Sequence, residues 1–301
     1  MTLFNPADIV VSAAPGGLAV AAAEDDAVLS AAAQAYQYKL AVPILCGDGK
    51  KIKMTAGARG IDISPFEIIH CASANESIAA AISLVRQKRA AVLMKGHVQT
   101  ADLLRAVLDR GSGLRQGGML SHVSVLDSPV MGRRFVITDA AMVAYPDLKA
   151  KVELIQNAVR VAAALGIQNP RVAALAAVEV VNPDMQATLD AAALTVMNRR
   201  GQISGCTVDG PLAMDLALSR EAARHKGVDS DVAGRADILL MPNIEAANIA
   251  VKAFTHGGNC LPGGVVIGAA APVVLNSRSD SDLSKLFSIF CAVAVSHLAR
   301  E

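Results

Sequence analysis

Short apolar runs alternate with amphipathic segments along the chain. Runs of four or five apolar residues, such as 91–94 and 172–176, have the length of buried strands. The segments between them, such as 25–38, carry apolar residues at spacings of three and four, which is typical of helices. Strands that alternate with helices form layers around mainly parallel sheets. The pattern therefore predicts an α/β fold.

The pattern also gives the expected element boundaries. Strands are expected at 41–46, 91–94, 123–126, 135–138, 172–176, 203–208, 236–241, 265–267 and 273–275. Helices are expected at 25–38, 75–89, 100–109, 148–165, 183–199, 246–254 and 282–298. Pro43 lacks an N–H group, which favours an edge position for the first strand. The glycine-dense segment 110–118 is either a hinge between two lobes or an ordinary surface loop.

Composition narrows the class of protein. A chain of 301 residues that is 53% hydrophobic can bury one large core or two modest ones. Its 28 Lys and Arg against 27 Asp and Glu leave a net charge of +1, so it has no broad positive field for a phosphate backbone. Aromatic residues make up 3% and Trp is absent, which argues against a base-stacking surface. We expect no nucleic-acid partner.

Membrane and metal classes are also disfavoured. The mean hydropathy is +0.41, yet the longest uncharged stretch, 253–277, is interrupted by Gly and Pro too often for a spanning helix. The segment 9–23 contains Pro15-Gly16-Gly17 and lacks the basic start of a leader peptide. The five cysteines are far apart, without metal-ligand or disulfide spacing. We expect no membrane segment, no metal and a cytoplasmic location.

Four polar loops follow predicted strands. In parallel sheets, ligands bind at the loops that follow the carboxyl ends of the strands. In the first loop, Gly96 permits close backbone approach after Lys95, His97 can transfer protons, and Thr100 can cap the next helix near an anion. Arg105, about one turn later, can add a bidentate phosphate contact. The alternatives are a simple cap at Thr100 and a solvated surface Arg105.

The second and third loops carry carboxylate and amide groups. Asp209, followed by Gly210-Pro211, either orients a substrate or belongs to a common turn. Asn243 either contacts a ligand or caps the helix after it. Asn248 needs a polar partner if it faces inward.

The fourth loop, 276–281, contains three hydroxyl groups, an arginine and a carboxylate within six residues. Arg278 can neutralise a phosphate or an oxyanion, and Ser277 can hold a nucleophile or its proton. The alternative is a helix start at which Asp280 or Ser281 is the cap and Arg278 is solvated.

In their order and spacing, these segments resemble the phosphate acetyltransferase and phosphate butyryltransferase family. The matching pieces are 94–100 with 103–105, 209–212, 241–243 with Asn248, and 272–281. The resemblance implies two α/β domains with a cleft, of the isocitrate/isopropylmalate dehydrogenase-like type. It places the first domain at 1–117 and 265–301 and the second at 118–264. A homodimer is usual in the family.

The resemblance also implies a reaction. The family moves an acyl group between coenzyme A and phosphate without a covalent acyl-enzyme, so coenzyme A is a substrate and no cofactor is expected. Ser277 would assist the coenzyme A thiol, and Arg278 would stabilise charge on the acyl phosphate. Arg105 would contact phosphate groups. The substrate-binding set would comprise Lys95, Gly96, His97, Thr100, Arg105, Asp209, Asn243 and Asn248.

One departure concerns the general base. Acetyl-specific members usually read Ser-Arg-Gly-Cys-Ser with an acidic residue seven positions beyond the first Ser, whereas this chain reads Ser-Arg-Ser-Asp-Ser and has Ser284 there. Asp280 or Asp282 would substitute as base. The run is closer to the butyryl branch, which favours an acyl chain longer than acetyl.

Two other functions stay open at this point. A dehydrogenase of the same fold would need clustered metal-binding aspartates, but Asp209, Asp215 and Asp237 are isolated in the sequence. A non-catalytic acyl-coenzyme A-binding protein would fit the missing acidic residue at Ser284.

Overall fold

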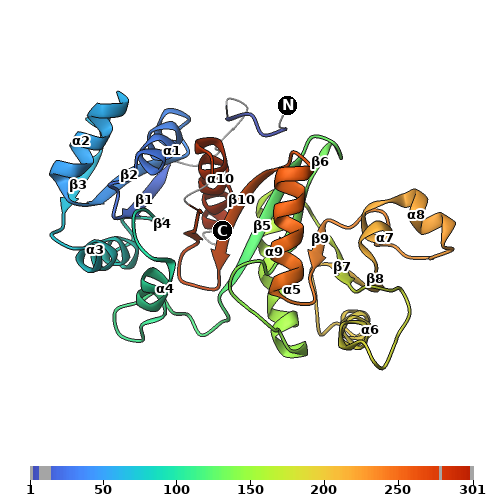
Figure 1. Ribbon diagram of the computed structural model, residues 1–301. Helices are drawn as coiled ribbons and strands as arrows, with labels where there is room; N and C mark the ends of the chain where they lie inside the picture. The colour runs from blue at the N-terminus through green and yellow to red at the C-terminus, as the bar shows by residue number, and fades with distance from the viewer. Residues whose placement is uncertain (1–2, 7–14, 278–279, 299–301) are drawn as a thin grey trace. The chain divides into compact units, whose positions relative to one another are not determined.

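The computed structural model describes residues 3–6, 15–277 and 280–298. It is a mixed α/β structure whose internal contacts divide it into two compact units (Figure 1). We call Phe4–Gly118 with Gly263–Glu301 the terminal unit, and Met119–Pro262 the central unit. None of the described helices is both long and apolar enough to cross a membrane.

The terminal unit has the strand order β3-β2-β1-β4-β11-β10. Its strands are β1 (Gly16–Ala21), β2 (Ala41–Gly47), β3 (Glu67–His70), β4 (Val92–Lys95), β10 (Leu261–Ile267) and β11 (Val273–Val274). The neighbouring pairs from β3 to β11 are parallel, and β10 pairs with β11 in the antiparallel sense. The predicted mainly parallel arrangement therefore holds in this unit.

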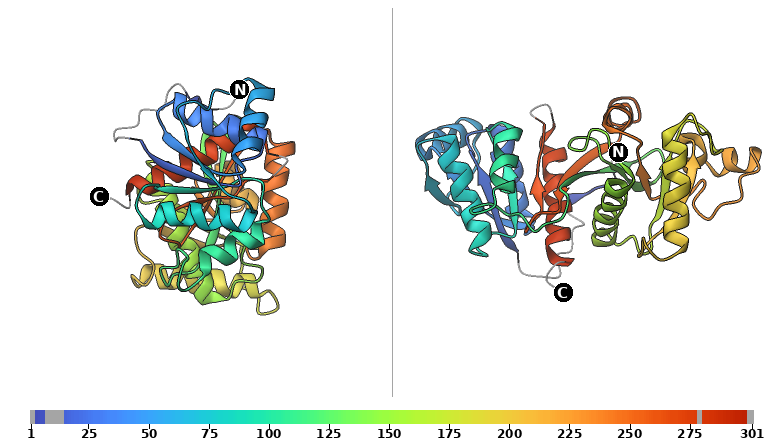
Figure 2. Two further views of the ribbon diagram at one scale, coloured as in Figure 1. Left: turned by 90° about the vertical axis from the view of Figure 1, so that its left-hand side faces the viewer. Right: turned by 90° about the horizontal axis from the view of Figure 1, so that it is seen from below.

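Helices of the terminal unit cover both faces of these strands (Figures 1 and 2). They are α1 (Asp26–Gln37), α2 (Gly49–Arg59), α3 (Ala74–Arg86), α4 (Thr100–Leu108) and α10 (Asp282–Leu298). Helix α1 packs beside α10, and α3 packs beside α4. Apolar side chains at helical spacing, such as Ile78 and Ile82 of α3, are buried against the strands. Because the helices after β1 and β4 cover opposite faces, the sheet has a topological switch point between these two strands.

The central unit has the strand order β5-β6-β9-β7-β8. Its strands are β5 (Ser121–Ser128), β6 (Arg133–Thr138), β7 (Arg171–Leu175), β8 (Thr207–Leu212) and β9 (Ile238–Leu240). Strands β5 and β6 form an antiparallel hairpin, and the other neighbouring pairs are parallel. Helices α5 (Leu148–Ala164) and α6 (Gln186–Arg199) pack against these strands.

Three shorter helices of the central unit pack around a buried apolar cluster. They are α7 (Met214–Leu218), α8 (Arg220–His225) and α9 (Ile244–Lys252), followed by a π-helical turn at Ala253–Gly257. Their apolar residues join the strand residues in one buried cluster, in which Phe135 meets Phe254 edge to face at 5.2 Å.

The structure corrects several element predictions. Strand β2 lies between β1 and β3, so the predicted edge position is wrong. Pro43 has no N–H group to donate, but β2 begins to pair with β3 only at the next residue, Ile44. The strand therefore tolerates Pro43, because its pairing with β3 needs no hydrogen bond from that residue. Strands β1 and β3 and helix α2 were not predicted. The weakly amphipathic α2 follows a Gly-Asp-Gly turn signal, which hides its start.

Candidate functional site

Two predicted loops leave the same edge of the terminal unit's sheet. The parallel register pairs Val274 of β11 with Met94 of β4, and Ala21 of β1 with Lys95 of β4. Adjacent strands lie about 4.8 Å apart. The loop that begins at Leu275 and the loop that begins at Gly96 are therefore neighbours, and the latter borders the switch point. This is the position at which ligands bind in open α/β sheets.

Gly96 brings the β4 loop against the end of β1. Its N–H donates to the Ala21 carbonyl at 2.8 Å, and the next N–H, of His97, donates to the Ala22 carbonyl at 2.7 Å. A Cβ atom at position 96 would lie 2.0 Å from the Ala22 oxygen. Gly96 is thus required by close backbone approach, as predicted, although the partner seen here is the protein's own strand β1.

The other members of this loop differ in burial. Lys95 is buried, and its ammonium donates to the carbonyls of Gly96 at 3.2 Å and Val98 at 3.3 Å. His97 and Thr100 are exposed. Thr100 is the first residue of α4 and Gln99 holds the cap position without a side-chain hydrogen bond, so the predicted cap at Thr100 is wrong.

Arg105 lies on the exposed side of α4. Its guanidinium contacts the carboxylate of Asp102, one turn earlier, at 2.8 Å, and its side chain is 75% exposed. Both residues line an open hollow of about 600 Å³ between α3 and α4, together with Arg86. An exposed pair of this kind is weak, which leaves the Arg105 guanidinium available to an anion.

Two hydrogen bonds join Ser277 and Asp280. The Ser277 N–H donates to the Asp280 carboxylate at 2.8 Å, and the Asp280 N–H donates to the Ser277 carbonyl at 3.3 Å. Ser281 accepts the Ser284 N–H at 3.1 Å, so Ser281 provides the helix cap foreseen in the alternative interpretation. Arg278 lies outside the described residues. Ser284 is buried on α10.

In the central unit, two predicted amides lie at the carboxyl end of β9. Asn243 caps α9 by accepting the Ala246 N–H at 2.9 Å, as the capping alternative predicts. Asn248 faces inward and donates to the Ala140 carbonyl at 3.1 Å. Ala140 follows β6, the strand next to β9. Asn248 therefore ties α9, the helix that follows β9, to the segment that follows β6.

Asp209 does not lie in a loop after a strand. Strand β8 runs from Thr207 to Leu212, so the predicted strand 203–208 is wrong and Asp209 pairs with Ala173 of β7 within the sheet. The strand starts late because the Asn198 side chain binds the carbonyls of Ile203 and Cys206 and holds that segment in a turn. Asp209 is half-buried, and its side chain has no hydrogen bond or ion pair in the part of the chain that the structure describes.

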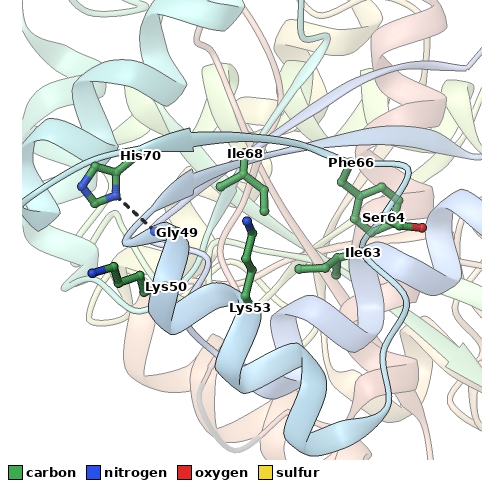
Figure 3. A pocket seen from close by; sticks show the side chains of 8 residues that line it. All are labelled: Gly49, Lys50, Lys53, Ile63, Ser64, Phe66, Ile68 and His70. Atoms are coloured by element: carbon green, nitrogen blue, oxygen red, sulfur yellow. Dashed lines mark hydrogen bonds between the residues drawn. The ribbon is translucent and has the colours of Figure 1, made fainter.

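A second hollow in the terminal unit was not predicted (Figure 3). It has a volume of about 680 Å³ and lies between α2 and β3, with Lys50 and Lys53 of α2 on one side and Ile68 and His70 of β3 on the other. Phe66, just before β3, also lines it. The Gly49 N–H donates to Nδ1 of His70 at 3.2 Å, which leaves the ring proton on Nε2.

Charge around this second hollow is only partly balanced. The Lys51 N–H bond to Asp48 is the main cause that holds the pKa of Asp48 below its usual value, so this carboxylate stays ionised. Lys50 and Lys53 have no ion pair with any described residue. The hollow suits a ligand that has an anionic and an apolar part. The sequence signal for it was the cluster of lysines after the Gly47-Asp48-Gly49 turn.

The fold and these loops define an α/β protein whose polar loops, at the carboxyl ends of its strands, are suited to anionic substrates. The family model described as phosphate acetyl/butaryl transferase matches residues 72–293. The chain is 48% identical to a phosphate butyryltransferase of Clostridium acetobutylicum, over 92% of each chain. It is 42% identical to a phosphate acetyltransferase of Thermotoga maritima, over 90% of this chain and 92% of that one.

A solved structure shows the same likeness. A branched-chain phosphotransacylase from Enterococcus faecalis V583 superposes with a TM-score of 0.83 at 32% identity, over 94% of this chain and 99% of that chain. The chain belongs to the phosphate acetyltransferase and phosphate butyryltransferase family.

Proposed function

We propose that the protein moves a short acyl group between coenzyme A and phosphate. The observation that carries this proposal is the 48% identity to a phosphate butyryltransferase over 92% of each chain. The neighbouring loops at Gly96 and Ser277 support it, because they put polar groups where α/β sheets bind ligands. Family membership gives no support to the alternative of a dehydrogenase.

In the proposed reaction, the coenzyme A sulfur attacks the carbonyl carbon of the acyl phosphate. The bond from that carbon to the phosphate oxygen breaks, phosphate leaves, and the thiol proton passes to a base. Ser277 would assist the thiol, Arg278 would stabilise the developing oxyanion, and Asp280 would serve as base. The reaction needs orientation and charge stabilisation, so we expect no cofactor besides the substrate coenzyme A.

The substrate-binding set remains as predicted from the sequence. Lys95, Gly96, His97 and Thr100 would form the loop beside Ser277, and Arg105 would bind a phosphate group. Asp209, Asn243 and Asn248 would contribute from the central unit. The capping bond of Asn243 and the bond from Asn248 to Ala140 would then hold these amides in place.

The preferred acyl group is proposed to be butyryl or a similar short chain. The Ser-Arg-Ser-Asp-Ser run and the higher identity to the butyryltransferase than to the acetyltransferase support this choice. We also propose two domains of the isocitrate dehydrogenase-like type, with boundaries after residues 117 and 264. The division into a terminal and a central unit supports this organisation.

A homodimer in the cytoplasm completes the proposal. The five cysteines are buried and form no disulfide among the described residues, as is common for proteins of reducing compartments. Light scattering coupled to gel filtration tests the dimer, and a monomeric mass at assay concentration would contradict it.

Phosphate-dependent release of free thiol from acetyl-, propionyl- and butyryl-coenzyme A tests the function. We expect turnover with all three and the highest kcat/KM with butyryl-coenzyme A. Tight binding of coenzyme A with no turnover for any acyl chain would overturn the proposal in favour of a non-catalytic binding protein. A highest kcat/KM for acetyl-coenzyme A would contradict only the acyl preference.

A further inference from the structure

Lys285 is a buried cation that has no carboxylate partner within the described part of the chain. It lies in the first turns of α10, the dark red helix in Figure 1, and its side chain is only 2% exposed overall. Lys151, which is similarly buried, forms an ion pair with Asp190 at 2.5 Å. Lys285 has no such pair with any described residue. A buried charge without a counter-charge is costly, so its retention needs an explanation.

The hydrogen bond that Lys285 does make links it, through Asp280, to Ser277. Its ammonium donates to the main-chain carbonyl of Asp280. The Asp280 carboxylate in turn accepts the Ser277 N–H at 2.8 Å. Lys285 therefore lies on the buried side of Asp280, one hydrogen-bond contact away from Ser277.

Asn276 contacts both Asp280 and helix α10. Its side-chain amide donates to Ser288 of α10 at 2.9 Å and approaches the Asp280 carboxylate at 3.4 Å. Its Oδ1 atom is buried and has no hydrogen-bond partner among the described residues. Next to Ser277 there are thus a buried amide oxygen without a hydrogen-bond partner and a buried ammonium without a carboxylate partner among the described residues. Unsatisfied buried polar groups are exceptions in folded proteins, and a catalytic role is one explanation for them.

We propose that Lys285 is a positioning residue for the acyl transfer. It holds the Asp280 carbonyl, and through Asp280 it fixes the main chain at Ser277. Its positive charge, which no described carboxylate neutralises, stabilises the anionic phosphate and thiolate that gather at Ser277. The inference rests on the proposed function, because it needs an anionic reaction at Ser277. The fixed charge acts from a buried position, where electrostatic effects are strongest.

Substitutions of Lys285 distinguish the effect of its charge on kcat from the effect of its packing on stability. Lys285→Met keeps the length of the side chain and removes the charge, so we expect an unchanged or higher free energy of unfolding. We expect kcat for phosphate-dependent release of coenzyme A from butyryl-coenzyme A to fall at least about 10-fold, with KM changed much less. Lys285→Arg keeps the charge and should restore part of kcat. A purely structural role would instead lower stability and leave kcat per folded molecule unchanged.

Two further variants keep the test decisive. Lys285→Gln keeps a donor toward the Asp280 carbonyl without the charge, and it decides the question if the Met variant fails to fold. Ser296→Ala removes another buried polar group of α10, which bonds only to Val293 among the described residues, and should leave kcat unchanged. Wild-type kcat in a folded Met or Gln variant would overturn the inference. Absence of phosphate-dependent release in the wild type would instead overturn the proposed function.

Discussion

At the scale of single residues, the close approach of two main-chain segments explains the residue at position 96 better than side-chain chemistry does. Gly96 is required because the Ala22 carbonyl occupies the space of a Cβ atom, and the two hydrogen bonds from Gly96 and His97 fix the loop against β1. The sequence signalled the glycine but not its partner. The same contact orients Lys95 and His97, so a change at Gly96 should affect both stability and binding.

Gly96→Ala is expected to lower the free energy of unfolding by about 1–3 kcal/mol, because the loop must move away from β1. We expect kcat/KM for butyryl-coenzyme A to fall with it. Urea unfolding and the thiol-release assay measure the two effects. Gly57→Ala is the control, since a Cβ atom at this site in α2 meets nothing within 4 Å and should stabilise the helix by about 0.5–1 kcal/mol. An active, stable Gly96→Ala variant would contradict the packing argument.

At the scale of elements, helix starts account for several residues that looked chemical in the sequence. Asn243 caps α9, Ser281 caps the first turn of α10, and Asp147 caps α5. A capping side chain at the carboxyl end of a strand is held rigidly, so it can also face a ligand. Capping and binding are therefore separate properties that different substitutions can distinguish.

Asn243→Ala should lower the free energy of unfolding by about 1 kcal/mol through loss of the cap. Asn243→Asp keeps a capping oxygen and should stay near wild-type stability. If Asn243 also binds substrate, both variants raise KM for butyryl-coenzyme A, because the Asp variant adds a negative charge beside an anion. Asp147→Ala, which removes a cap in the same unit, should lose similar stability with KM unchanged. An unchanged KM in Asn243→Asp would restrict Asn243 to capping.

At the scale of the whole molecule, a net charge of +1 gives no general attraction for anions. Polyanionic substrates must then be attracted by a few placed cations, among which Arg105 is exposed and only weakly paired. The salt dependence of activity should therefore come from individual groups and not from the overall field.

Salt is expected to lower kcat/KM for butyryl-coenzyme A moderately as the Debye length shrinks from about 30 Å at 0.01 M to about 10 Å at 0.1 M. Arg105→Gln should lower kcat/KM at low salt and flatten this dependence. Arg59→Gln is the matched control: Arg59 is also exposed and paired, with Asp26, and its loss changes the net charge equally. Steady-state kinetics over a salt series measure both. Equal slopes for the two variants would show that Arg105 has no special part in attraction.

The sequence by itself determined the alternation of strands and helices, the polar loops and the family, because periodicity and motif order are local properties of the chain. Glycine at position 96 and the capping alternatives at Asn243 and Ser281 were also local signals. Only the tertiary structure decided that Asp209 lies inside a strand, that β2 is not an edge, and that Lys285 is buried against Asp280, which in turn bonds to Ser277. These properties depend on which distant segments pair, and such pairing is set by packing between residues far apart in the chain.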